Sequence, residues 1–486
     1  MIGRLTLFES TGTLAKRWSL NAAGEAVKET GAQMAKGSYA VCSFGNVGEL
    51  TALLDSVTTK QAVCCSLPLD GSTQGDITTK RAPKPGAKAR SKHEFGLLAT
   101  PGALFLDHDA PAGSQGLTRD ELWSRLLKEL PALASACVVW RPSGSSHIFK
   151  GSEDLTRLRG QHLFVLIADA SDAPRVVKII AARLWLAGLG KVLVSKAGSL
   201  LLRCPIDTAP SDAARLIFAG AAECGEGLEQ RRGPAVVLND GGFLDSRVLV
   251  PDLTAEEQGR YEALVEQAKA AASPEALRAK AAHRGDVVAK RLPAMMKKHG
   301  LSAAESEQRI GDAIDSAYGG VLLADFELTA VHDDGRRETV TVAEVLASRD
   351  RWHEVDVLDP INPGHRGGAA DARLFLHGTS PIVYSLDDGG TVYRLRAAKK
   401  SLSVAKGSRG ELVAKLAAIV ANDDRVFGTA GGVVLVERGK MLTLTVDRLM
   451  NLIGSLVVLV VKTAKGDAPT DVTRETAVLV LAALST

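Results

Sequence analysis

The sequence predicts an α/β or α+β core over residues 1–250, followed by a helical segment and a small C-terminal α+β module. Two observations carry this prediction. Before Pro251, short apolar runs typical of strands alternate with amphipathic helices, and polar residues follow several of these strands. After Pro251, Ala- and Glu-rich helical periodicity replaces that alternation. We therefore expect a functional site where strands of the core sheet end, at one edge of the sheet.

The composition is that of an ordinary globular protein. The chain has 486 residues, with 45% hydrophobic and 24% charged residues, and is long enough for several domains. Its formal net charge of +3 places any nucleic-acid affinity in local patches. The six cysteines form no Cys-x-x-Cys pair and predict free thiols in a reducing compartment. No signal-peptide pattern begins the sequence, and the apolar run at 452–461 is too short to cross a bilayer, so we expect a soluble, cytoplasmic protein without membrane partners.

The first 100 residues are expected to mix strands and a helix, with strands at 39–43 and 61–67 around a helix at 47–54. Between residues 71 and 91, basic side chains gather among prolines and glycines. This spacing predicts a mobile cationic loop without regular structure, which is either a solvated surface or a clamp on nucleic-acid phosphates. The basic residues of this loop, with one that follows it, are Lys80, Arg81, Lys84, Lys88, Arg90 and Lys92.

The rest of the core is expected to alternate strands and helices. Pro131 lies just beyond the first of these helices, where a helix commonly stops. The predicted elements are helices at 119–129 and 174–186 and strands at 137–140, 160–167, 191–194 and 200–203.

Three further regions follow the core. Residues 251–320 are expected to form a helical domain, in which Thr254 and Glu257 make a capping box and Ser273–Pro274 restart a helix. No Gly-x4-Gly-Lys-Ser/Thr sequence occurs, so no ATPase phosphate-binding loop of that type is present. Residues 321–400 are expected to form a strand-rich linker region and residues 401–486 a C-terminal module, with strands within 326–342, 372–384, 391–395, 432–436 and 442–446 and helices at 411–421 and 448–453.

The strongest chemical signal is a pair of aspartates at the end of an apolar run. In Leu106-Asp107-His108-Asp109, Asp107 and Asp109 point to one face of the expected strand and His108 points to the other. Two neighbouring carboxylates repel each other unless a cation lies between them. Mg²⁺ takes oxygen ligands and often combines one or two carboxylates with substrate phosphates. The pair therefore suits metal-dependent phosphate chemistry.

Other polar side chains follow neighbouring strands of the predicted core. Ser143 and Ser145 follow the strand at 137–140, and His162 opens the strand at 160–167. Arg203 ends the strand at 200–203, and Asp207 follows it. Three carboxylates that converge on metal, with serines and a histidine nearby to hold phosphates, are what nucleotidyl transfer requires, because the metals activate the attacking hydroxyl and stabilise the leaving pyrophosphate.

Residues 35 to about 235 resemble the catalytic domain of the archaeo-eukaryotic primase superfamily, especially the bifunctional primase-polymerases of phages, plasmids and integrated elements. That family has an Asp-h-Asp motif (h is apolar), a histidine on a strand after a serine-containing loop, and a later h-Asp motif. Here Asp107-His108-Asp109, Arg141 to Ser146 with Gly160-Gln161-His162, and Ile206-Asp207 match them in order. The flanking sequence at residues 184–190, 195–198 and 215–218 also resembles that of this family.

The resemblance implies a DNA primase or primase-polymerase with an RNA-recognition-motif-like catalytic sheet beside an N-terminal α/β module. It implies that Asp107, Asp109 and Asp207 bind Mg²⁺ or Mn²⁺. Residues 359–395 resemble a segment that often follows such domains, and the last 80 residues resemble a winged-helix module that precedes a helicase motor. The expected partners are therefore single-stranded DNA template, nucleoside triphosphates and a separate helicase. The expected nucleotide ligands are His162, Ser143, Ser145, Lys196 and Arg203, and the cationic loop would contact template or primer.

Several alternatives stay open. His108 replaces an apolar residue of the family motif, so it either packs under a helix with a hydrogen-bond partner or marks a drifted site. His147 directly follows the serine loop, but the Gly-x-His-aromatic context favours His162 as the motif histidine. The alternative for His162 is a structural histidine of the core. The alternative for Asp207 is a carboxylate that caps the backbone before Thr208. The rival functions are a replication initiator that binds origin DNA without synthesis and a metal-dependent nuclease.

Overall fold

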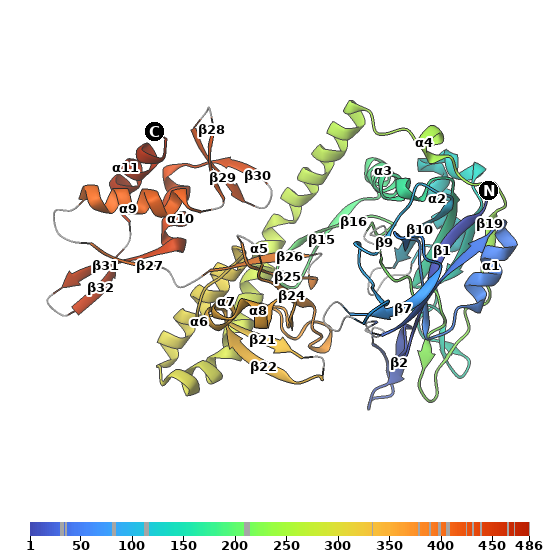
Figure 1. Cartoon of the computed structure of the whole chain (residues 1–486), viewed down its shortest axis with the longest axis horizontal. Helices are drawn as coiled ribbons and strands as arrows, with labels where there is room; N and C mark the ends of the chain where they lie inside the picture. Colours follow the sequence, from blue (N-terminus) through green and yellow to red (C-terminus); the bar gives the residue numbers. More distant parts are fainter. Residues whose placement is uncertain are drawn as a thin grey trace. The chain divides into compact units, whose positions relative to one another are not determined.

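The computed structural model describes residues 1–29, 34, 36–79, 84–110, 116–208, 214–332, 334–377, 380–387, 390–396, 400–404, 409–423, 425–429, 432–437, 440–463, 466–470 and 472–485. The protein is a mixed α/β protein with several β-sheets and a long helical segment (Figure 1). It divides into two compact units, one of residues 1–195 and 200–277 and the other of residues 196–199 and 278–486.

A five-stranded sheet opens the first unit. Its strand order is β5-β1-β4-β7-β8, and helix α1 (Val47–Ser56) follows β4. Asn46 caps α1 because its side chain accepts a hydrogen bond from the backbone amide of Glu49. The expected absence of regular structure between residues 71 and 91 is wrong for two segments, which pair in parallel as β7 and β8. The strands are β1 (Gly3–Ser10), β4 (Gly37–Phe44), β5 (Gln61–Cys64), β7 (Gln74–Thr78) and β8 (Lys88–Ala89).

A four-stranded antiparallel sheet forms the centre of this unit, in the order β10-β14-β11-β19. Helix α2 (Arg119–Glu129) connects β10 to β11, and helix α3 (Ala173–Leu186) follows β14. Figure 1 shows α2 and α3 lying together beside β10. The strands are β10 (Gly102–Asp109), β11 (Val138–Pro142), β14 (Gly160–Ile167) and β19 (Val236–Asn239).

Both faces of the central sheet are buried. Leu104 and Leu106 point to one face and pack in one apolar cluster with side chains of α2 and α3. Phe105 and Phe164 point to the other face and pack with residues of β1, β4 and α1, including Leu5. The alternation of strand side chains thus divides the core into two layers, and only the end of the sheet remains for polar groups.

Short pairings complete the first unit. They are β2 (Arg17–Leu20) with β3 (Ala26–Glu29) and β17 (Glu223–Cys224), β12 (Ile148–Lys150) with β13 (Glu153–Asp154) and β18 (Glu229–Gln230), β15 (Lys191–Val194) with β16 (Leu200–Arg203), and β6 (Leu67–Pro68) with β9 (Phe95–Gly96); short helices are η1 (Pro131–Ser135), η2 (Ala170–Asp172) and α4 (Ser246–Leu249).

Helix α5 (Ala255–His299) contains the division between the units. Its N-terminal capping box is confirmed, since the amide of Glu257 donates to Thr254 Oγ1 at 3.1 Å. The predicted restart at Ser273–Pro274 is wrong: the helix continues, and Ser273 Oγ donates to the carbonyl of Lys269 at 2.8 Å. A serine hydroxyl that bonds within a helix no longer acts as a cap, so Ser-Pro is not a specific start signal.

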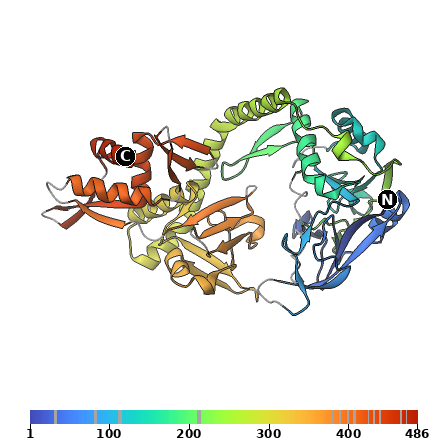
Figure 2. The ribbon, with the colours of Figure 1, turned by 45° about the horizontal axis from the view of Figure 1, so that its top comes forward.

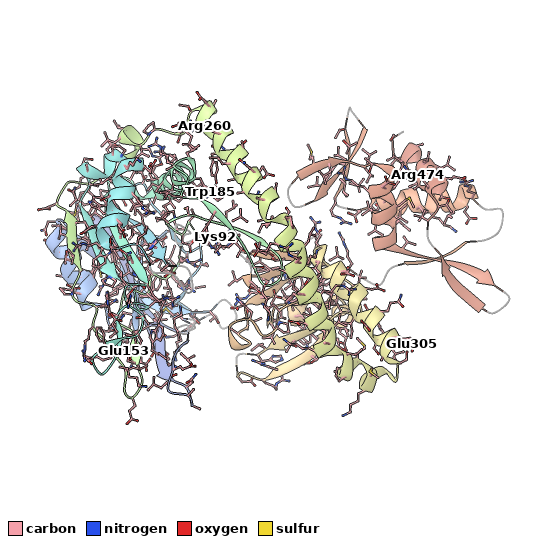
Figure 3. The ribbon with its side chains drawn as sticks, turned by 180° about the vertical axis from the view of Figure 1, so that it is seen from behind. Lys92, Glu153, Trp185, Arg260, Glu305 and Arg474 are labelled. Atoms are coloured by element: carbon pink, nitrogen blue, oxygen red, sulfur yellow. The ribbon has the colours of Figure 1, made fainter. Side chains whose placement is uncertain are left out.

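Helix α6 (Ala303–Tyr318) begins with its own capping box between Ser302 and Glu305, and Figure 3 labels Glu305. A seven-stranded sheet then curls into a half-barrel, and Figure 2 shows its yellow-to-orange strands beside α6. Its order is β20-β26-β25-β24-β23-β21-β22, with β20 (Val321–Leu322), β21 (Glu327–Val331), β22 (Arg337–Thr341), β23 (Asp356–Val357), β24 (Ala372–Phe375), β25 (Ile382–Ser385) and β26 (Thr391–Leu395); α7 (Val342–Ala347), α8 (Arg349–Trp352) and η4 (His365–Gly367) lie in its connections.

The C-terminal part has its own apolar cluster, which gathers side chains of three helices. The expected second strand of the hairpin ends earlier than 446, because Thr445 caps the helix that begins at Val446. Among the described helices, none is long and apolar enough to span a membrane. The elements are β27 (Lys400–Val404), α9 (Arg409–Ala421), β28 (Val426–Thr429), β29 (Gly432–Glu437), β30 (Lys440–Thr443), α10 (Val446–Leu456), β31 (Val457–Thr463), β32 (Gly466–Thr470) and α11 (Arg474–Leu484).

Candidate functional site

A row of polar residues crosses the central sheet at the end of β10. Asp107 pairs directly with His162 of β14, and His162 pairs with Arg141 of β11. On the other edge of β10, the amide of Asp207 donates to the carbonyl of Asp107 at 2.8 Å and forms an isolated bridge. Directly opposed residues on antiparallel strands point to the same face. The structure therefore brings residues of all three predicted motifs into one row.

Asp109 lies two residues further along β10, opposite Gly160. A Cβ on Gly160 would lie 2.7 Å from Asp109 Oδ1 and 2.2 Å from Ser143 Oγ, closer than real side chains approach. Glycine at this position leaves the space that both polar side chains occupy. Ser143 and Asp109 thus meet above Gly160, next to the row that contains Asp107.

The Asp107 carboxyl is unusual in its surroundings. Its side chain is only 22% exposed, and its Oδ1 is buried without a hydrogen-bond partner. Burial raises the pKa of Asp107 to about 7, and the negative charges of Asp109 and Asp207 act in the same direction. The charges of Lys16 and Arg215 oppose that shift. An ionised carboxylate here is therefore costly unless a cation approaches it.

His162 lies almost fully buried beside Asp107. Its Nε2 is 3.7 Å from Asp107 Oδ1, its Nδ1 has no hydrogen-bond partner, and its ring meets the ring of Phe105 edge-on at 5.1 Å. Burial holds the pKa of His162 well below its usual range, and the cations Lys16, Arg232 and Arg141 lower it further. The imidazole is therefore neutral at pH 7 and offers one N–H donor.

His147 has different surroundings. Its backbone is left-handed, with φ of 56°, and its Nδ1 lies 2.8 Å from Asp154 Oδ2. Each of the two histidines thus contacts a different aspartate, and His162 is the one that contacts the first motif.

The serine loop is held from several directions. Lys16 Nζ donates to Ser145 Oγ at 2.6 Å, and Gln230 Nε2 donates to the carbonyls of Ser143 at 3.2 Å and Ser146 at 2.8 Å. Ser143 and Ser146 are fully buried, and Ser145 is nearly so. The two hydroxyls predicted to hold a triphosphate are therefore bonded within the protein, since Ser143 Oγ also accepts a hydrogen bond from the amide of Ser145 at 3.2 Å, and both side chains are covered.

His108 behaves as the first of its two alternatives describes. It shares the face of Leu104 and Leu106 toward α2 and α3, it is 5% exposed, and its Nδ1 lies 2.5 Å from the carbonyl oxygen of Pro205. Pro205 precedes Asp207 by two residues, so His108 also helps to hold the third motif against β10.

Two predicted basic ligands belong to the hairpin of β15 and β16, where Lys196 lies between the strands and Arg203 ends β16. Arg203 is exposed at the end of β16, and its guanidinium donates to the carbonyl of Leu202 at 3.2 Å. Lys196 belongs to the second compact unit. A role for either residue in binding nucleotide or template stays a prediction.

The basic segment after β7 is partly engaged within the protein. Lys84 pairs with Asp76 at 2.6 Å, and Lys88 pairs with Asp70 at 2.6 Å. Arg90 is half-buried and donates to the carbonyl of Ala214 at 2.6 Å, whereas Lys92, labelled in Figure 3, is exposed. Lys80 and Arg81 lie outside the described residues. A role of these side chains in binding nucleic acid stays a prediction.

Sequence reasoning assigned no role to four cations near the row: Lys16, Arg141, Arg215 and Arg232. Arg141 and Arg232 are tied to backbone carbonyls, among them those of Leu54 and Ala219. Lys16 belongs to no motif, and it lies so far from Ser145 along the chain that the sequence does not predict their contact.

Asp107, Asp109 and Asp207 are the residues that could hold a metal ion. The unpartnered oxygen of Asp107 and the hard oxygen donors beside it fit Mg²⁺ or Mn²⁺. Within the described part of the chain, no three His, Cys, Asp or Glu side chains already surround one point. No protein-family model, curated protein or solved structure matches the chain.

Proposed function

We propose that this protein is a metal-dependent, template-directed nucleotidyltransferase, a DNA primase or primase-polymerase of a mobile element. The observation that carries the proposal is the buried Asp107 carboxyl, which has an oxygen without a partner and lies in one row with Asp207 and a neutral His162. The motif order that resembles the primase superfamily adds to it.

The strand order around β10 supports the RNA-recognition-motif-like sheet of this proposal. The chain runs β10, α2, β11, β14, α3 and then the Asp207 segment. In space the Asp207 segment lies next to β10, followed by β14 and β11. This is the interleaved arrangement of a split β-α-β fold, with both helices packed on one face of the sheet.

In the proposed mechanism, Asp107, Asp109 and Asp207 would hold Mg²⁺ or Mn²⁺, which when bound would activate the primer hydroxyl and stabilise the leaving pyrophosphate. Asp107 would bind the ion in its ionised form, so the metal would compete with a proton at this carboxyl. Neutral His162 donates a hydrogen bond to a phosphate oxygen without gaining a charge that would repel the ion. Phe105 and Phe164 exclude water beneath the row.

The remaining parts serve substrate handling in this proposal. The serine loop positions the nucleotide, and Lys92 and its basic neighbours contact single-stranded template. Residues 401–486 would act as a winged-helix-like docking module for DNA or a separate helicase, since the sequence carries no ATPase loop of the Walker type. The protein would work in the cytoplasm.

The test uses the purified full chain with single-stranded DNA, labelled nucleotides and Mg²⁺ or Mn²⁺, read on a denaturing gel. We expect new labelled strands that vanish on chelation. Shortened DNA would instead support a nuclease that uses the same carboxylates. DNA binding that survives chelation, with no incorporated nucleotide, would support a replication initiator.

A further inference from the structure

Lys16, in the segment between β1 and β2, contacts the serine loop from the N-terminal part of the chain. Lys16 Nζ donates to Ser145 Oγ at 2.6 Å, and its aliphatic stem lies along Gly144, 3.7 Å from the position of a Cβ there. Its charge acts on both Asp107 and His162. Lys16 is therefore part of the immediate surroundings of the row, although no motif contains it.

The backbone around Lys16 is firmly held. Leu14, Ala15 and Trp18 are buried, and the amide of Glu223 donates to the carbonyl of Lys16 at 2.9 Å. The indole N–H of Trp18 donates to the carbonyl of Gly144 at 3.1 Å. The segment around Lys16 and the serine loop are thus bonded to each other, and buried residues on both sides of Lys16 fix its position.

The charge of Lys16 has no anionic partner among the described residues. Of the carboxylates that the structure describes, none lies within ion-pair distance of Lys16 Nζ, whereas the neighbouring Arg17 pairs with Glu223 at 2.9 Å. An ammonium group has three donors, and Ser145 accepts one of them. A half-buried cation with spare donors beside metal-binding carboxylates is an arrangement that a phosphate group would complete.

We propose that Lys16 binds the β- or γ-phosphate of the incoming nucleoside triphosphate, an inference that rests on the proposed function. Ser145 holds the ammonium in place before the substrate arrives. The interaction is made with the terminal phosphates, so it distinguishes triphosphates from monophosphates. It also supplies a cation that Lys196 and Arg203 were expected to provide.

The test compares nucleotide binding and synthesis by Lys16→Met with those of wild-type protein. Methionine keeps much of the stem that packs on Gly144 and removes the charge. We expect the dissociation constant for nucleoside triphosphate, measured by equilibrium dialysis with Ca²⁺, to rise about tenfold, the size of one charge-assisted contact. The constant for the monophosphate should change less than about twofold, and KM for the triphosphate should rise more than kcat falls.

The matched control is Arg17→Ala, which removes the same charge one residue away, where an exposed ion pair is worth little. We expect its nucleotide affinity and melting temperature to stay near those of wild type. Equal weakening of triphosphate and monophosphate binding by Lys16→Met would overturn the inference in favour of a structural role, as would unchanged triphosphate binding. If wild-type protein synthesises DNA while Lys16→Met matches it, only this inference fails. If wild-type protein neither binds triphosphate nor synthesises DNA, the proposed function fails with it.

Discussion

Two buried aspartates, one in each compact unit, show how differently the same side chain is used. Asp359, in the loop after β23, is 3% exposed and accepts hydrogen bonds from Ser385 Oγ at 2.6 Å and from the amides of Ile361 and Asn362 at 2.9 and 2.6 Å. Asp107 is also largely buried, but one of its oxygens has no partner.

Burial raises the pKa of both carboxyls above the usual range. A raised pKa alone therefore does not separate a structural aspartate from a functional one. The hydrogen bonds distinguish these two acids, because the satisfied one fixes the loop around it, whereas we propose that the unsatisfied one, which lies beside two other acids, is stabilised by a cation or a proton.

The largest expected difference is catalytic. Asp107→Ala should lower synthesis by roughly 10³-fold, because a lost metal ligand removes several kcal/mol of transition-state stabilisation. Asp359→Ala should leave the rate per folded molecule within about threefold of wild type. Nucleotide incorporation by both variants is measured on a denaturing gel. Near-normal synthesis by Asp107→Ala would contradict the metal-site assignment.

Stability should show the opposite ranking. Asp359→Ala leaves one hydroxyl and two amide donors without their acceptor and should lower the free energy of unfolding by roughly 3 kcal/mol. Asp107→Ala should cost little at pH 8, because the Asp107 Oδ1 that it removes has no hydrogen-bond partner among the described residues. Denaturant unfolding of the metal-free proteins measures this, and equal losses would erase the distinction between the two acids.

The pH dependence of stability sharpens the comparison. The folded-state pKa of Asp107 is about 7, above its unfolded value, so the folded state binds the extra proton and stability falls as pH rises toward 7. Asp107→Asn removes that loss. Its stabilisation over wild type should grow between pH 5 and pH 8 by roughly 2 kcal/mol in the absence of metal. A constant difference across this range would mean that Asp107 titrates as an ordinary acid.

The two histidines give a smaller contrast. His162→Ala removes the donor beside Asp107 and should raise KM for nucleotide or lower kcat, together about 10- to 100-fold. His147→Ala loses its contact with Asp154 and should change either constant less than about twofold. Nucleotide titrations that rank the variants in the opposite order would place the second motif at His147.

Local patterns predicted the core elements well. The helix at 119–129 and the strand at 160–167 agree with α2 and β14, because capping residues and an unbroken apolar run mark them. The row of Asp107, His162 and Asp207 could be expected from strand ends. Lys16 could not, because only the tertiary fold brings it to Ser145. The prediction that a new helix starts at Ser273–Pro274 was wrong, because that dipeptide is compatible with the interior of a helix as well as with its start.

The central claim is that Asp107, unlike Asp359, is completed by a divalent cation. Mn²⁺ titration followed by electron paramagnetic resonance tests it directly, with wild-type protein, Asp107→Asn and Asp359→Asn at pH 6 and pH 8. We predict that wild type and Asp359→Asn bind Mn²⁺, with affinity about tenfold higher at pH 8 because a proton no longer competes at Asp107. Asp107→Asn should lose this site at both pH values. Equal Mn²⁺ binding by Asp107→Asn and wild type would contradict the account.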